Sequence, residues 1–69
     1  MSEAQTKRIN LKELKEGDVV WCPQFKRYIT FEEYVEDDGY FFKNTFTTGF
    51  TVLNRGFVYE PSSLIKELL

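Results

Sequence analysis

The sequence predicts one small, mainly β domain of about five short antiparallel strands with short helical turns. Two observations lead to this class. Runs rich in β-branched and aromatic residues, which are typical of strands, alternate with turn residues along most of the chain. Aromatic residues also make up 17% of the 69 residues, and large rings can fill a core that would otherwise be marginal at this length.

The start of the chain is expected to be a tail followed by a helical turn. Residues 1–8 show no apolar periodicity and predict a flexible N-terminal tail, which leaves residues 9–69 as the single domain. Residues 9–17 then predict one helical turn. Asn10 stands at its N-cap, and Glu13 occupies the capping-box position three residues later.

The stretch at residues 28–39 is compatible with two structures. In a strand, Phe31 and Val35 share a face with Glu33, so this arrangement requires a bulge. In a helix near residues 30–38, a threonine N-cap and a glutamate three residues later form a capping box. The sequence leaves both open, and the helix would change the class to α+β.

The remaining elements are mostly strands. Residues 40–47 alternate most clearly, with Tyr40, Phe42 and Phe46 on one face. Asn and Gly tolerate the positive φ of a tight hairpin, so residues 54–56 are expected to join two paired strands. The other expected elements are strand 18–22 ended by Pro23, strands 50–53 and 57–59, and from Ser62 either a Ser-capped helix or a helical turn with a last short strand.

Two segments resemble parts of known small barrels. The run L-x-x-L-K-E-G-D-V-V-W, from Leu11 to Trp21, is similar to the start of Src-homology-3-like barrels of the Tudor and KOW type. The run GFVYEPSSLI, from Gly56 to Ile65, is similar to their close, where a strand leads into a Pro-Ser helical turn. The resemblance implies a small antiparallel Src-homology-3-like barrel and assigns no functional residues.

Composition argues against several functional classes. The chain has no histidine and a single cysteine, so it lacks the usual general base and a disulfide framework. Cys22 lies in an apolar strand and is expected to be a buried, reduced thiol. We therefore expect no enzymatic activity, no cofactor and no metal site. Without an apolar run long enough for a membrane span or a signal peptide, the expected location is the cytoplasm, which fits a bacterial or phage cytosol.

An acidic cluster with aromatic neighbours is the main candidate site. Aromatic side chains supply much of the binding energy at interfaces, and complementary charge steers association. The sequence therefore predicts a small non-catalytic protein-binding module, an accessory or inhibitory factor whose partner it does not identify. Self-association through an exposed strand is a further expectation. The expected surface comprises Tyr34, Glu36, Asp37, Asp38 and Tyr40, with Glu32 and Glu33 near its edge.

The alternative is a nucleic-acid-binding small barrel. Nine Lys and Arg face eleven Asp and Glu, which gives a net charge of −2 and no overall basic character. A local groove can still bind single strands when cations accompany an aromatic platform. The residues for such a site are Lys26, Arg27, Tyr28 and Lys43.

Overall fold

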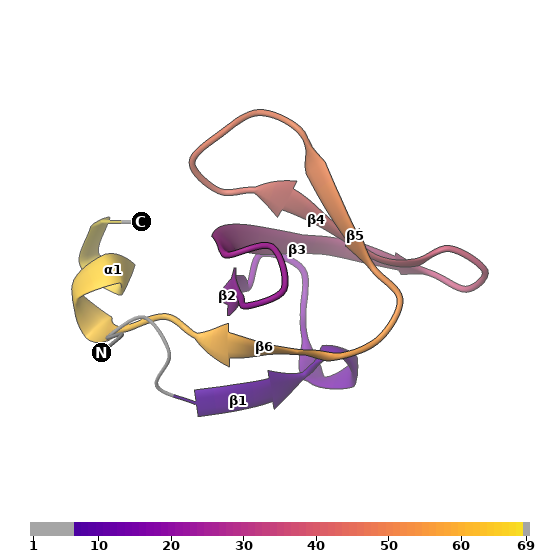
Figure 1. Cartoon of the computed structure of the whole chain (residues 1–69), viewed down its shortest axis with the longest axis horizontal. Coiled ribbons are helices and arrows are strands. Elements are labelled where there is room, and N and C mark those ends of the chain that lie inside the picture. Colours follow the sequence, from indigo (N-terminus) through magenta and orange to yellow (C-terminus); the bar gives the residue numbers. More distant parts are fainter. Residues whose placement is uncertain (1–6, 69) are drawn as a thin grey trace.

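The computed structural model describes residues 7–68, which form a six-stranded antiparallel sheet and one short helix (Figure 1). The strand order is β1-β6-β2-β3-β4-β5. The mainly β prediction is therefore confirmed. The elements are β1 (Lys7–Asn10), the 3-10 turn η1 (Leu11–Glu13), β2 (Val19–Cys22), β3 (Arg27–Val35), β4 (Gly39–Asn44), β5 (Phe50–Leu53), β6 (Phe57–Glu60) and α1 (Ser63–Leu68).

The sheet is open, so the expectation of a closed barrel is wrong. Its two edges are β1 and β5, and it has six strands where about five were expected. The additional strand is β1, in which Lys7 and Arg8 pair with Glu60 and Tyr59 of β6. These two residues were assigned to the N-terminal tail, whose residues 1–6 lie outside the described part. Backbone pairing needs no apolar pattern, which is why a polar strand escaped detection.

η1 is shorter than the expected helical turn, and Asn10 does not cap it. The Asn10 side chain makes no hydrogen bond to the backbone of η1. Its Nδ2 instead donates to Oε2 of Glu13 at 3.3 Å, so the capping box does not form. Leu11 is the buried residue of this turn and anchors it on the core.

β3 resolves the ambiguity of residues 28–39 in favour of a strand with a bulge. The register passes from Phe31 opposite Phe42 to Glu33 opposite Phe41, which leaves Glu32 as the extra residue. Glu33 is thereby exposed instead of entering the core. The helical alternative is wrong because the long backbone ladder with β4 satisfies more groups than a local capping box.

β4 ends at Asn44, earlier than the expected strand at residues 40–47. Asn44 is buried, and its Nδ2 donates to the carbonyl of Thr48 at 3.0 Å. This bond closes the loop that leads into β5. Phe46 therefore does not share a face with Phe42; it lies in the loop with 58% of its surface exposed.

Residues 54–56 do not form the expected hairpin, because β5 and β6 are not neighbours. The segment carries the chain from the edge of the sheet to the position between β1 and β2 (Figure 1). Gly56 has φ of 116°, as a sharp corner requires. Asn54 does not have positive φ; its Nδ2 donates to the carbonyl of Asp38 at 3.0 Å.

The core lies on one face of the curled sheet, and α1 contributes no buried residue to it. Ser62 precedes α1, and its Oγ accepts a hydrogen bond from the N–H of Ile65 at 3.5 Å. The Ser-capped helix is therefore confirmed, whereas residues 63–68 contain no last strand. The buried apolar residues are Leu11, Val20, Cys22, Ile29, Phe31, Phe42, Leu53 and Val58.

Candidate functional site

The tip of the β3–β4 hairpin brings the expected partner-binding residues together. Tyr34 and Tyr40 are register partners, and their ring centroids lie 4.6 Å apart. The exposed turn between the two strands carries Glu36, Asp37 and Asp38. The hairpin extends beyond the rest of the molecule at the right of Figure 1. We define Tyr34, Glu36, Asp37, Asp38 and Tyr40 as the hairpin tip.

Hydrogen bonds hold the turn in one shape. The Asp38 N–H donates to the carbonyl of Val35 at 3.0 Å, and the Asp38 carbonyl accepts from Nδ2 of Asn54. The Tyr34 hydroxyl donates to the carbonyl of Glu36 at 3.3 Å. The backbone that carries the carboxylates is therefore hydrogen-bonded within the hairpin and to Asn54.

Gly39 allows the hairpin to lie against β5. Its φ is 118°, and a Cβ built at this position would lie 2.7 Å from the carbonyl oxygen of Leu53. Tyr40, the next residue, packs partly buried against the core, with its ring 6.2 Å from that of Phe31. Only glycine fits this approach, so the base of the hairpin tip is tied to the body of the domain.

The hairpin tip combines negative charge with an exposed ring. None of its carboxylates forms an ion pair with a side chain of residues 7–68. The ion pair present in this part of the chain joins Lys66 and Glu60, away from the hairpin tip. The Tyr34 side chain is 53% exposed. Glu33 is exposed on the adjoining strand and extends the acidic surface. Such a surface can bind a basic partner that also has an apolar pocket for the tyrosine ring.

The structure divides the residues of the nucleic-acid alternative between two places. Lys26 lies in the β2–β3 turn with φ of 55°, and Arg27 follows with its guanidinium 5.8 Å from the ring of Phe25. Tyr28 and Lys43 instead point to the face of the sheet opposite the core. The four residues therefore do not form one compact cluster.

Sequence reasoning missed a connected series of aromatic side chains on that outer face. Phe57 and Tyr59 of β6 have ring centroids 5.4 Å apart, and Tyr59 is the register partner of Trp21. The Trp21 ring lies 4.8 Å from that of Tyr28, which in turn lies 5.9 Å from Phe46. We define these five residues as the aromatic row.

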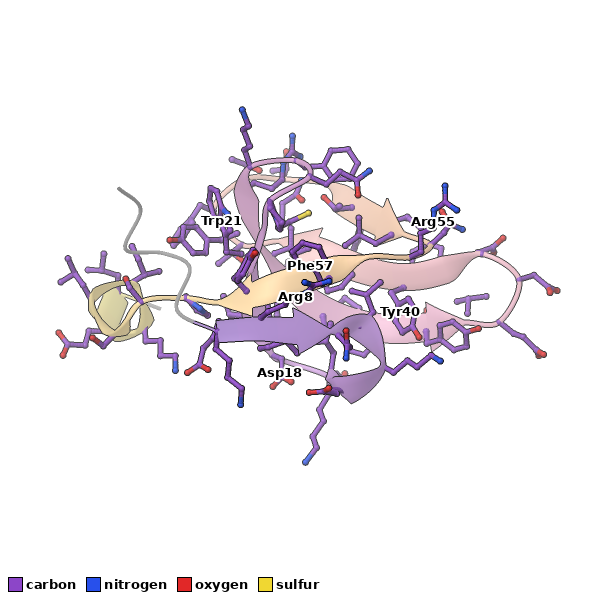
Figure 2. The ribbon with its side chains drawn as sticks, turned by 60° about the horizontal axis from the view of Figure 1, so that its bottom comes forward. Arg8, Asp18, Trp21, Tyr40, Arg55 and Phe57 are labelled. Carbon is purple, nitrogen blue, oxygen red and sulfur yellow. The ribbon has the colours of Figure 1, made fainter. Side chains whose placement is uncertain are left out.

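Arg8 ends the aromatic row on the β1 side. Its guanidinium carbon lies 3.9 Å from the centroid of the Phe57 ring, within the range of a cation–π contact. Figure 2 shows Arg8 and Phe57 together on neighbouring strands, with Trp21 farther along the same sheet. The four rings that lie on strands each stand next to a buried residue in sequence, which signals an outer position, but the row forms only because β6 lies beside β2.

Within residues 7–68, two ionisable groups have shifted pKa values. Burial raises the pKa of Tyr28 above its usual value of 10.0. The hydrogen bond and the charge of Lys66 lower the pKa of Glu60 below 4.5, with a smaller contribution from Lys7. Neither group belongs to the hairpin tip.

Cys22, which the sequence predicted to be a buried thiol, is free and buried in β2. Residues 7–68 contain no group of three or more His, Cys, Asp or Glu side chains placed to hold a metal ion. In the same residues, no helix has the length and apolar character needed to cross a membrane.

No family model, curated protein or solved structure matches this chain. The geometry of the hairpin tip and of the aromatic row is therefore the basis for a functional proposal.

Proposed function

We propose that this chain is a small non-catalytic module that binds a protein partner through the hairpin tip. The observation that carries the proposal is the projecting turn with three exposed carboxylates beside the 53%-exposed ring of Tyr34. The partner that fits is a protein surface bearing Lys or Arg side chains around an apolar depression. In such a contact the module acts as an accessory or inhibitory factor by covering its partner's surface.

In this proposal the ring of Tyr34 supplies binding energy, and the carboxylates speed association. A buried aromatic ring removes about 150–250 Å² of surface from water and is a common interface anchor. The carboxylates raise the association rate and make it sensitive to salt. Because hydrogen bonds already fix the turn, little conformational freedom is lost on binding.

Two finer points belong to the same proposal. The run from Leu11 to Trp21 and the Pro-Ser close after β6 support a relationship to small Src-homology-3-like modules, although the sheet stays open. A free thiol at Cys22, with no disulfide framework, supports a cytoplasmic location. Both are compatible with a binding role that needs no cofactor.

Capture of a partner from lysate tests the proposal. The variant Glu36→Lys/Asp37→Lys reverses the charge of the turn, and Tyr34→Ala removes the ring; each should release the partner captured by the wild-type chain. The control Glu16→Lys/Glu67→Lys makes the same charge change at exposed positions outside the hairpin and should retain it. A partner held equally by all four chains would refute binding through the hairpin tip.

The aromatic row favours a second candidate function, binding of single-stranded nucleic acid. Rings on an open sheet face stack with bases at about 1–3 kcal/mol per base, and cations beside them contact phosphates. Arg8 and Lys43 supply such cations on the outer face.

Trp21 is the only tryptophan of the chain and lies in the row, so its fluorescence reports on stacking directly. Quenching by oligothymidylate that weakens as salt increases supports this second function. Emission that does not change with oligonucleotide, together with partner capture that depends on the hairpin tip, rejects it in favour of the first.

A further inference from the structure

β5 is an edge strand without the features that normally protect an edge. It has one neighbour, β4, and its residues Phe50–Leu53 include no charge and no proline. Charged side chains and proline are the usual means of preventing edge-to-edge pairing. The opposite edge, β1, does carry charged side chains, namely those of Lys7 and Arg8. The two edges of this sheet are thus unequal.

The backbone register shows which groups of β5 are open. The Asn44 N–H donates to the carbonyl of Gly49 at 3.1 Å just before the ladder of β4 and β5. Bonded and non-bonded pairs alternate in an antiparallel ladder, so Thr51 directs its backbone groups towards β4. The N–H and C=O groups of Phe50 and Val52 therefore point away from β4, towards the open edge.

The side chains at the same positions are apolar and exposed. Phe50 is 70% exposed and Val52 is 39% exposed, and both lie on the outer face, whereas Thr51 and Leu53, which alternate with them, are buried. Phe46, in the loop before β5, is 58% exposed. Open backbone groups and unburied apolar side chains thus occur together on one short strand.

We propose that β5 pairs antiparallel with β5 of a second copy of this chain, about a two-fold axis through Thr51. This register places Phe50 of each copy opposite Val52 of the other, on the same outer face. The pair then exchanges the two N–H and two C=O groups that are open in the single chain. A register shifted by one residue would place outer side chains against core-facing ones, so the axis must pass through a residue. Of the possible centres, Thr51 is the one that pairs Phe50 with Val52 and so uses the open groups of both residues.

A second copy fits this edge because the strand is complementary to itself. Pairing brings no charged side chain of β5 against another, whereas two β1 edges would oppose Lys7 and Arg8 to their own copies. The two sheets join into one continuous sheet, and the two-fold axis closes the assembly at a dimer.

The contact is small. A four-residue strand with two outer apolar side chains buries less than the roughly 800 Å² per partner of a standard interface. The dimer is therefore weak and reversible and forms at high protein concentration.

Sedimentation velocity at concentrations from about 10 µM to about 1 mM tests the assembly, because this range brackets weak dissociation constants. The weight-average mass of the wild-type chain should rise from that of one chain towards twice that value. Val52→Lys and the more exposed Phe50→Lys should keep the mass of one chain throughout, with far-UV circular dichroism verifying the fold. Leu64→Lys, a control at a 68%-exposed apolar position on α1, should associate like the wild type.

Amide hydrogen exchange tests the register. The N–H groups of Phe50 and Val52 should exchange more slowly as concentration increases, while that of Thr51, already bonded to β4, should not change. A wild-type mass that stays at one chain overturns the proposal. Dimerisation that survives both lysine variants, or that is lost in Leu64→Lys, also overturns it by placing the contact elsewhere.

Discussion

Asn44 is expected to be the most important buried polar side chain for the stability of the β4–β5 connection. It is 6% exposed, its Nδ2 donates to the carbonyl of Thr48 at 3.0 Å, and its Oδ1 accepts from the hydroxyl of Thr51 at 2.7 Å. The substitution Asn44→Ala removes both bonds. It also leaves the buried hydroxyl of Thr51 without its partner.

The magnitude follows from these two bonds. Each contributes a net of about 0.5–1.5 kcal/mol, and a buried group left unpaired costs about 1–3 kcal/mol. We therefore expect Asn44→Ala to lower the free energy of unfolding by about 2–4 kcal/mol. A domain of 69 residues has a total of about 3–10 kcal/mol, so this loss is a large fraction of the stability of the fold.

Urea denaturation followed by Trp21 fluorescence measures this loss, and a double-mutant cycle assigns it. Thr51→Val, which keeps the shape of the side chain, should cost about 1–3 kcal/mol because Oδ1 of Asn44 then lacks its donor. The double variant should cost less than the sum of the two by about 1 kcal/mol, since removing both partners leaves neither unpaired. A cost below about 0.5 kcal/mol for Asn44→Ala, or strict additivity, would show that this network does not stabilise the fold.

Three further predictions concern other parts of the domain. Gly39→Ala should destabilise the fold more than Gly17→Ala in urea: both have positive φ and cost about 1–3 kcal/mol in strain, but only at Gly39 would the new Cβ meet a backbone oxygen at 2.7 Å. Lys66 lowers the pKa of Glu60 in the folded state, so the ionised carboxylate should stabilise the fold above pH 4.5, and this stabilisation should be lost as pH falls through the lowered pKa. The free energy of unfolding, measured by urea denaturation at several acidic pH values, should fall with pH in the wild type and fall less in Lys66→Met. Cys22, fully buried, should react with a thiol reagent only as fast as the protein unfolds, and rapid labelling of the native chain would contradict its burial.

The strands were predictable where side chains alternate or are uniformly apolar. The predicted strands 18–22 and 50–53 agree with β2 and β5 to within a residue. β1 was not predictable, because polar residues at its positions are held by backbone bonds to β6. Long-range pairing also explains why residues 54–56 were wrongly predicted to form a hairpin. The positive φ expected at a glycine was correct for Gly56, but which strands pair depends on the whole sheet.

The two candidate sites also differ in how far local sequence could predict them. The residues of the hairpin tip are close in sequence, so one hairpin is enough to bring Tyr34 and Tyr40 together. The aromatic row joins side chains from distant strands, such as Trp21 and Tyr59, and requires the order of the sheet. Local sequence therefore predicted the hairpin tip but could not predict the aromatic row.

The position of β6 makes the beginning of the chain depend on its end. β1 joins the sheet only through β6, and β6 is also the second neighbour of β2. During synthesis, residues 7–10 therefore have no strand to pair with until residues 57–60 have been added. A polypeptide interrupted before that point lacks Val58 of the core and leaves β2 with β3 as its one neighbour. A strand that is synthesised after β2–β5 thus takes an interior position in the sheet, between β1 and β2.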